Sequence, residues 1–555
     1  MRKIISLFLL FPIIGFAQTW EQIVIAPGSD TSNPMFFTEY NNQLYFSARG
    51  TSVSGIGREL YKTDGTQAGT GLVMDLNPNY SGSSSDPSNF TVFNGELYFT
   101  AEDGVHGREL FKTDGTTIHL VKDIHVGTGF STNHSGNMMA MYEADGALYF
   151  FAEDLPGEGY DLWKTDGTEQ GTVKVLELNT NESSGLKLRF KKLGNLLCFV
   201  KNDQNTNHNE IYAYNPTTNT ATSVLDAYPS NNTSGYGYFT LFDNKLFVVA
   251  DKLYYTDGTT TNSVALGATG ITAFDKLTVL NNELFFFGKS ATYGNQDLYK
   301  CYYSLSEHDY KVELVYNFNA GGSNFLNPIG ILTDVGTEIL IGLNNKLYFA
   351  AREQTSPNGG VVYQIYETDG TTTQVAIPVT YSGSPTSRSI HPITPFGNKL
   401  YFQMSGDNSP KQLWEANPSD ATFTQLTSDT GPPTQPREIF PRPMKVWNNS
   451  LYLEGNTLAE GYELWKFTAD ELSTANESIE VRVGVHPNPF TTFITLNVEN
   501  ITDFTVSVHN IAGQSVKFDI QNNRINFGIL PQGIYYLTLL NKTTNKQFTE
   551  KIIRK

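Results

Sequence analysis

Residues 59–66 read Glu-Leu-Tyr-Lys-Thr-Asp-Gly-Thr, and this stretch decides how the rest of the chain is interpreted. Close copies begin at Glu109 and Asp161, and looser ones begin at Lys252 and Gln364. Four more degraded copies begin at Glu210, Asp297, Gln412 and Glu463. A segment that recurs at a near-constant interval is typical of a repeat architecture.

A second motif, a turn followed by a short apolar run, precedes each copy. It is well preserved at residues 42–46, which read Asn-Gln-Leu-Tyr-Phe. Its central leucines are Leu44, Leu97, Leu148, Leu197, Leu246, Leu284, Leu347, Leu400 and Leu451. Their successive spacings are 53, 51, 49, 49, 38, 63, 53 and 51 residues. The run has little polar alternation, which predicts a strand that is covered on both faces.

Each repeat predicts four antiparallel strands, which is the unit of a propeller blade. The apolar run and the Glu-Leu-Tyr-Lys segment form a hairpin. Residues 173–176 illustrate the third strand, and residues 90–93 illustrate the strand that precedes the next copy. The Asp-Gly pair predicts a tight turn whose two central residues both have positive φ. The chain is therefore expected to be all-β.

Residues 18–470 are expected to form the propeller, with nine blades by repeat count. Closed rings usually have four to eight blades, so eight blades remain possible, and the spacings of 38 and 63 residues mark where the count could fail. Residues 22–25 resemble the last strand of a blade, and no comparable strand follows residues 463–466. The N-terminal strand is therefore expected to complete the last blade and close the ring. A β-solenoid is the alternative stacking.

These repeats resemble the family of secreted bacterial proteins named for Glu-Leu-Trp-x-x-Asp-Gly-Thr repeats. Five copies keep Thr-Asp-Gly-Thr, and the central residue is tryptophan in three copies, at Trp163, Trp414 and Trp465. The resemblance implies a propeller-like scaffold with no fixed activity.

The first 17 residues are expected to be a signal peptide. Arg2 and Lys3 precede an apolar stretch that ends in Gly15-Phe16-Ala17, and small residues at these positions suit cleavage after Ala17. The stretch is too short for a membrane span, which needs about 20 apolar residues. No later segment is long and apolar enough, so no transmembrane span is expected.

The C-terminal segment is expected to be a separate domain. Residues 471–484 are small and polar and are interpreted as a linker, and residues 485–555 carry a separate short β pattern. The motif residues of this pattern are Pro487, Asn488, Pro489, Gly513, Gly533, Tyr535 and Lys551. The pattern resembles the type A sorting domain of the type IX secretion system of Bacteroidetes, a small immunoglobulin-like β-sandwich. The resemblance implies transport across the outer membrane, removal of the domain and, often, attachment to surface lipopolysaccharide.

The charge of the chain argues against nucleic acid as a partner. The net charge is −18 over 555 residues, and phosphate binding needs a basic face. The signal peptide carries +2 and residues 486–555 carry +3, so the remainder carries −18 − 2 − 3 = −23. A strongly acidic exported body stays soluble and avoids anionic surfaces.

The aspartates of the Asp-Gly-Thr copies are the most conspicuous candidate site. They could bind calcium, but calcium needs six to eight oxygens at one point, whereas one aspartate per blade is spread around a ring. Degraded copies place Asn215-Pro216 and Asn417-Pro418 at the turn, which keeps turn chemistry without the carboxylate. We therefore expect a structural turn at Asp64, Gly65, Asp114, Gly115, Asp166, Gly167, Asp257, Gly258, Asp369 and Gly370.

No catalytic, metal or cofactor motif is found in the sequence. The nine histidines lack metal-ligand spacing, and Cys198 and Cys301 lie two repeats apart, which predicts two buried thiols. Two functions remain. The first is a secreted or surface-displayed module that binds a glycan or protein, with the type IX machinery as its transport partner. The alternative is a polysaccharide-active hydrolase or lyase with an axial pocket, which needs convergent acids.

Overall fold

The computed structural model of the chain contains two compact units, Met1–Leu472 and Ser473–Lys555. It describes residues 18–555 except 126–138, 156–158, 181–189, 204–207, 227–237, 250–251, 260, 264–270, 274–276, 291–295, 318–326, 329–339, 355–360, 380–389, 391–392, 405–410, 429, 431–433, 441–443, 458, 470–483, 487–489, 498–500, 502–503, 511–514, 522, 529 and 542–546. The expected signal peptide and nearly all of the expected linker lie outside these residues.

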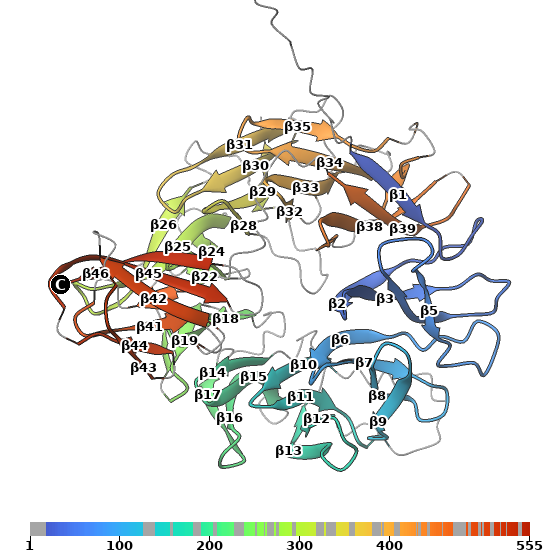
Figure 1. Cartoon of the computed structure of the whole chain (residues 1–555), viewed down its shortest axis with the longest axis horizontal. Helices are drawn as coiled ribbons and strands as arrows, with labels where there is room; N and C mark the ends of the chain where they lie inside the picture. The colour runs from blue at the N-terminus through green and yellow to red at the C-terminus, as the bar shows by residue number, and fades with distance from the viewer. Residues whose placement is uncertain are drawn as a thin grey trace, which may run out of the picture. The chain divides into compact units, whose positions relative to one another are not determined.

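The described part of the first unit forms nine antiparallel sheets, one for each repeat copy (Figure 1). The first strands of the sheets, which lie toward the centre of the ring, are β2 (Met35–Tyr40), β6 (Ser88–Phe93), β10 (Met139–Ala144), β14 (Phe190–Leu193), β18 (Tyr238–Phe242), β22 (Ile271–Ala273) with β23 (Thr278–Leu280), β27 (Asn327–Pro328) with β28 (Ile341–Leu343), β32 (Thr394–Phe396), and β36 (Glu438–Ile439) with β37 (Lys445–Trp447). The second strands, which carry the apolar run, are β3 (Gln43–Arg49), β7 (Glu96–Glu102), β11 (Ala147–Ala152), β15 (Leu196–Asp203), β19 (Lys245–Val249), β24 (Glu283–Ser290), β29 (Lys346–Gln354), β33 (Lys399–Met404) and β38 (Ser450–Asn456).

The third strands carry the Glu-Leu-Tyr-Lys segment or its degraded form. They are β4 (Arg58–Thr63), β8 (Arg108–Thr113), β12 (Tyr160–Thr165), β16 (His208–Asn215), β20 (Leu253–Thr256), β25 (Gln296–Ser304), β30 (Val361–Thr368), β34 (Gln412–Asn417) and β39 (Glu463–Thr468). The fourth strands are β5 (Gly71–Met74), β9 (Ile118–Lys122), β13 (Val173–Thr180), β17 (Thr220–Asp226), β21 (Thr261–Ser263), β26 (Asp309–Tyr316), β31 (Thr373–Val379), β35 (Thr422–Gln425) and β1 (Thr19–Ile23).

The N-terminal strand completes the last sheet, as the sequence predicts. Strand β1 pairs antiparallel with β39, with Thr19 opposite Thr468 and Ile23 opposite Leu464. The strand covers residues 19–23, whereas the sequence predicts residues 22–25. It ends at Ile23 because the backbone N–H groups of Ile25 and Ala26 bond to the carboxylate of Glu463 instead of to a strand.

The apolar runs are buried on both faces because each sheet packs between two others. Leu44 and Phe46 of β3 pack against Leu464 of the last sheet. Tyr45, which points to the opposite face because strand side chains alternate, packs against Leu97 of the next sheet. Burying each such side chain contributes about 2 kcal/mol.

The hydrophobic core of the first unit is divided among the contacts between neighbouring sheets. Each of nine clusters joins two consecutive sheets, and the ninth joins the last sheet to the first. The sheets therefore follow one another around a closed ring, which is a β-propeller. A stacked solenoid would not bring the last sheet against the first, so the alternative stacking is excluded.

The second unit is a two-sheet sandwich. One sheet has the order β40 (Gly484–His486), β41 (Phe493–Asn497), β44 (Arg524–Asn526) and β43 (Asp519–Gln521), and the other has the order β42 (Phe504–Asn510), β45 (Gly533–Asn541) and β46 (Gln547–Arg554). Side chains from both sheets share one core, with Ile494 and Ile525 from the first and Val508 and Leu537 from the second. The immunoglobulin-like topology stays a prediction.

Candidate functional site

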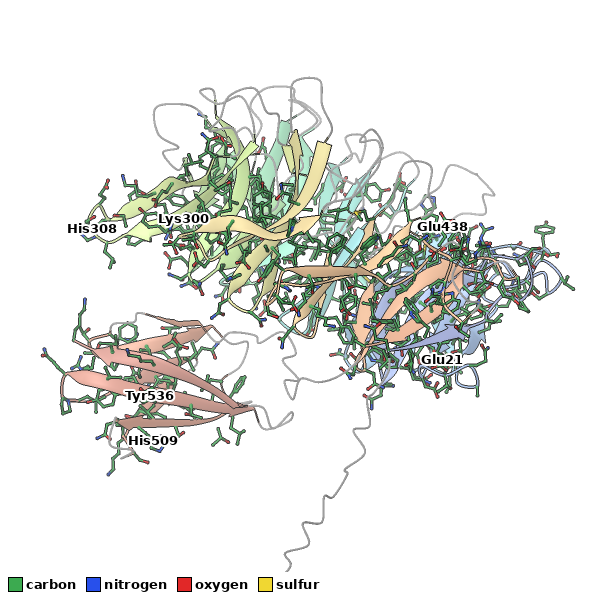
Figure 2. The ribbon with its side chains drawn as sticks, turned by 90° about the horizontal axis from the view of Figure 1, so that it is seen from above. Glu21, Lys300, His308, Glu438, His509 and Tyr536 are labelled. Carbon is green, nitrogen blue, oxygen red and sulfur yellow. The ribbon has the colours of Figure 1, made fainter. Side chains whose placement is uncertain are left out.

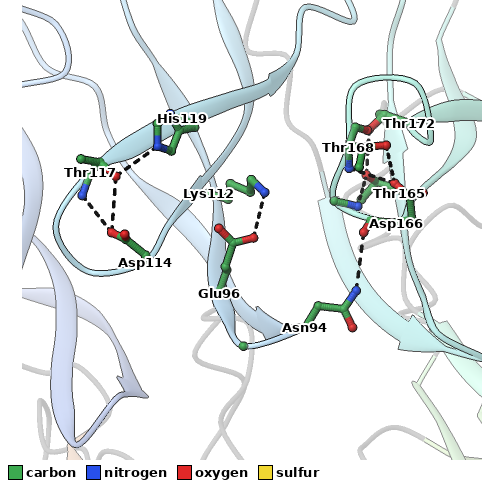
Figure 3. A network of polar contacts seen from close by, with 12 residues as sticks. Asn94, Glu96, Lys112, Asp114, Thr117, His119, Thr165, Asp166, Thr168 and Thr172 are labelled. Carbon is green, nitrogen blue, oxygen red and sulfur yellow. Dashed lines mark hydrogen bonds and ion pairs between the residues drawn. The ribbon is translucent and has the colours of Figure 1, made fainter.

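Each Asp-Gly-Thr copy forms the same kind of hydrogen-bonded turn between the third and fourth strands of its sheet. Asp114 Oδ1 accepts hydrogen bonds from the backbone N–H of Thr116 at 2.8 Å and from the Thr116 hydroxyl at 2.7 Å. It also accepts the backbone N–H of Thr117 at 3.0 Å (Figure 3). The same bonds to the threonine two residues later occur at Asp64, Asp166, Asp257 and Asp369. These bonds hold the pKa of Asp114 well below its ordinary value.

The predicted pair of positive φ angles is wrong for this turn. Gly115 has φ of +96°, but Asp114 is not among the residues with positive φ. The aspartate side chain closes the turn by taking the place of a backbone acceptor, so the aspartate can keep a negative φ. Paired positive φ angles occur instead in the turns before the apolar runs, for example 49° at Asn41 and 54° at Asn42.

The turn glycine lies against the preceding sheet. A Cβ atom at Gly115 would lie 2.5 Å from the hydroxyl oxygen of Tyr45. The corresponding distances are 2.3 Å from Gly167 to Tyr98, 2.6 Å from Gly65 to Tyr452, 2.6 Å from Gly258 to a methyl carbon of Leu196, and 2.9 Å from Gly370 to a carboxylate oxygen of Glu283. The turn therefore needs glycine both for its φ and for the close approach.

The lysine of the motif also connects neighbouring sheets. Lys62 Nζ donates to the carbonyl oxygen of Gly115 at 2.8 Å, and Lys300 Nζ (Figure 2) donates to that of Gly370 at 3.2 Å. At the closure, Lys466 of the last sheet donates to Gly65 of the first sheet at 3.1 Å. The motif therefore stabilises the contact between consecutive sheets.

The first residue of the motif is a buried acceptor, a role that the sequence analysis missed. Glu59, Glu109 and Glu463 are fully buried. Glu109 accepts backbone N–H groups from Ile124 at 3.0 Å and from His125 at 2.9 Å, just beyond the fourth strand. Burial raises the pKa of each of these three carboxyl groups to about 7. The sequence contained one indication of this role, because an acidic residue recurs at the start of an otherwise apolar strand.

The buried glutamates predict a pH-dependent stability. Their folded pKa of about 7 lies above the ordinary value of about 4.5, so their contribution to stability is complete below about pH 4.5 and is lost as the pH rises to 7. Each adds a slope of about 1.4 kcal/mol per pH unit within that window. The variant Glu59→Gln is therefore expected to flatten the decline of the unfolding free energy between pH 5 and 7 by that amount, measured by urea unfolding. An unchanged slope would contradict the assignment.

Nine registered positions surround the centre of the ring, and we call them the axial positions. Each lies on a first strand directly opposite the recurring leucine, as Glu39 lies opposite Leu44. The axial positions are Glu39, Val92, Glu143, Lys192, Leu241, Val279, Gly342, Pro395 and Val446. None is buried, and the exposed fractions include 43% at Val279 and 36% at Val446. The same backbone position therefore recurs in every sheet, but its side chain differs from sheet to sheet.

The sorting-domain residues are described in part. Pro487, Asn488, Pro489 and Gly513 lie outside the described residues. Gly533 begins β45, and the hydroxyl of the buried Tyr535 donates to the carbonyl of Pro531 at 2.8 Å. Lys551 lies opposite Tyr536 in the β45–β46 pair.

Cys198 and Cys301 are buried free thiols, and burial raises the pKa of each to about 12. Within the described ranges, no group of three or more His, Cys, Asp or Glu side chains is arranged to hold a metal ion. Among the same residues, no helix is long and apolar enough to cross a membrane.

The fold and the motif contacts define a β-propeller built from repeats, followed by a small β-sandwich. A comparison with protein families matches residues 484–555 to the secretion system C-terminal sorting domain. The chain is therefore a propeller protein exported by the type IX secretion system. No curated protein matches the chain.

Several solved structures resemble the chain weakly. PorZ of Porphyromonas gingivalis, an essential surface component of its type IX secretion system, is 12% identical over 94% of this chain and 75% of its own, with a TM-score of 0.29. The β-propeller domain of the Trilobed protease from Pyrococcus furiosus is 11% identical over 73% of this chain and 100% of its own, with a TM-score of 0.31. At such scores the likeness carries no argument, and the fold rests on the sheet topology.

Proposed function

We propose that the mature chain is a binding module or scaffold for a glycan or a protein, displayed at the cell surface after its sorting domain is removed. The observation that carries the proposal is the contrast within the ring. The motif aspartates, glutamates and lysines are engaged in contacts that repeat from sheet to sheet, whereas the axial positions are accessible and differ from one another. A rigid frame that presents variable side chains suits recognition.

The axial positions divide into two arcs. Leu241, Val279, Gly342, Pro395 and Val446 follow one another on five consecutive sheets and carry no charge. The other arc carries Glu39, Glu143 and Lys192. A ligand that contacts both arcs would meet apolar surface on one side and charged groups on the other, which is the mixture that binding sites use for affinity and orientation.

The proposal is tested on intact producing cells that lack the native gene and are complemented with defined variants. Cells with the full chain are expected to expose it to added protease and to bind a fluorescent neutral polysaccharide or a labelled surface-protein fraction. The double variant Leu241→Lys with Val446→Lys is expected to lower binding at least tenfold, because it places two positive charges in the uncharged arc of axial positions. Chain that lacks residues 484–555 is expected to be protected from protease.

The matched control places the same charges elsewhere on the ring. Leu314 and Val375 lie on fourth strands with exposed fractions of 37% and 38%, close to those of Leu241 and Val446. Leu314→Lys with Val375→Lys is expected to bind normally. Equal loss in both double variants would overturn the axial assignment, and release of reducing sugar from the polysaccharide would favour the hydrolase or lyase.

A further inference from the structure

Phe36 occupies a backbone conformation that suits its side chain poorly. Its φ is +63°, a region in which bulky residues are rare. The cause is a β-bulge in β2, where Met35 pairs with Ser47 and Thr38 pairs with Tyr45, so that Phe36 and Phe37 share one position of the partner strand. The first residue of such a bulge is usually glycine.

The next sheet contains the same bulge with a better-suited residue. Ser88 pairs with Thr100 and Thr91 with Tyr98, and Asn89 takes the place of Phe36 with φ of +56°. Asparagine tolerates this conformation far better than phenylalanine does. In both sheets the second bulge residue packs inward, with ring centroids 5.5 Å apart for Phe37 and Phe46, and 5.8 Å apart for Phe90 and Phe99.

Burial does not compensate for the strain at Phe36. The side chain is 54% exposed and does not belong to the core cluster that includes Phe37. An exposed aromatic ring held in an unfavourable conformation points to a function, because such outliers persist where they serve binding or catalysis. Its strand β2 is a first strand and also carries the axial residue Glu39.

We propose that Phe36 is a stacking platform for the ring of a neutral sugar. The inference rests on the proposed binding function and names its ligand class. The C–H groups on one face of a pyranose are attracted to the electron-rich face of an aromatic ring, which an exposed phenylalanine offers.

The carboxylate of Glu39 and the acidic net charge of the chain favour a neutral sugar with free hydroxyls. Glu39 lies three residues along β2, about 10 Å away at the usual rise per residue, is exposed, and makes no hydrogen bond or ion pair within the described part of the chain. Its carboxylate can accept hydrogen bonds from hydroxyl groups of the same saccharide. The net charge of −18 disfavours anionic polysaccharides.

The test is the substitution Phe36→Asn, which copies the residue of the next sheet. The mature chain is compared with the variant by affinity electrophoresis in gels that contain a mixed-linkage β-glucan, a mannan, a xylan or the anionic alginate. The unmodified chain is expected to be retarded by at least one neutral polysaccharide, and the variant to lose that binding at least tenfold. The thermal midpoint of the variant is expected to be unchanged or higher, which a merely structural role for Phe36 would not give.

Two further variants complete the test. Tyr80→Asn removes another exposed aromatic, 69% exposed, and is expected to bind like the unmodified chain, whereas Phe36→Tyr is expected to keep binding. Retained binding in Phe36→Asn overturns the platform and leaves the proposed binding function standing. Retardation by alginate alone, or by none of the four polysaccharides, also overturns the inference, and in the second case the protein-binding form of the proposed function remains.

Discussion

Replacing Ile23 with aspartate is expected to lower the unfolding free energy of the ring by about 4 kcal/mol, because it buries a charge without a partner. Ile23 is fully buried where β1 completes the last sheet, in the cluster that joins this sheet to the first. The measurement is urea unfolding followed by tryptophan fluorescence. All five tryptophans, Trp20, Trp163, Trp414, Trp447 and Trp465, lie in the first unit, so the signal reports on the ring alone.

The matched control for Ile23→Asp is Thr19→Asp on the same strand. Thr19 is exposed and pairs with Thr468. The same charge at this position is expected to change the unfolding free energy by less than about 0.5 kcal/mol. If the two variants unfold at the same urea concentration, β1 does not close the ring in solution.

Replacing Gly115 with alanine is expected to destabilise the ring by about 3 kcal/mol. About 1 kcal/mol comes from forcing alanine to a φ of +96°, and the rest, about 2 kcal/mol, comes from the Cβ atom pressing on the Tyr45 hydroxyl. The measurement is again tryptophan fluorescence during urea unfolding.

A double-mutant cycle separates the two causes of this effect. Gly95 has φ of +77° and open space around its missing Cβ, so Gly95→Ala is expected to show the backbone cost alone. In a Tyr45→Phe background, which lacks the hydroxyl, Gly115→Ala is expected to lose most of its steric cost. Equal effects of Gly115→Ala in both backgrounds would show that the contact between the sheets contributes nothing.

The sequence predicted the elements that depend on local pattern. The apolar runs around Leu44 and its eight counterparts are second strands, and the Glu-Leu-Tyr-Lys segments and their degraded forms are third strands, because every copy keeps short runs of mainly apolar residues at these places. Ring closure was predicted because one strand was missing at the end of the array and one was spare at its beginning. The strand ends at Ile23, two residues before the predicted end, because the carboxylate of Glu463, distant in sequence, binds the N–H groups of Ile25 and Ala26.

The roles of the motif residues could not be predicted, because they depend on contacts between sheets. A single sequence does not show that Gly115 touches Tyr45 or that Lys62 reaches the carbonyl of Gly115, since these residues belong to different repeats. The axial positions can be recognised only from the strand register. They share no single residue type, so the sequence alone does not mark them. Phe36 became conspicuous only when its φ was known.

Closure by the first strand has a consequence for the order of events during synthesis. Thr19 is made near the start of the chain, yet its partner Thr468 is added almost 450 residues later. At a translation rate of roughly 5–20 residues per second, this delay is on the order of tens of seconds. During that interval the N-terminal strand has no partner strand, so ring closure is the last step of assembly. A chain that is interrupted before its ninth sheet would leave two unpaired strand edges, which could pair with other proteins.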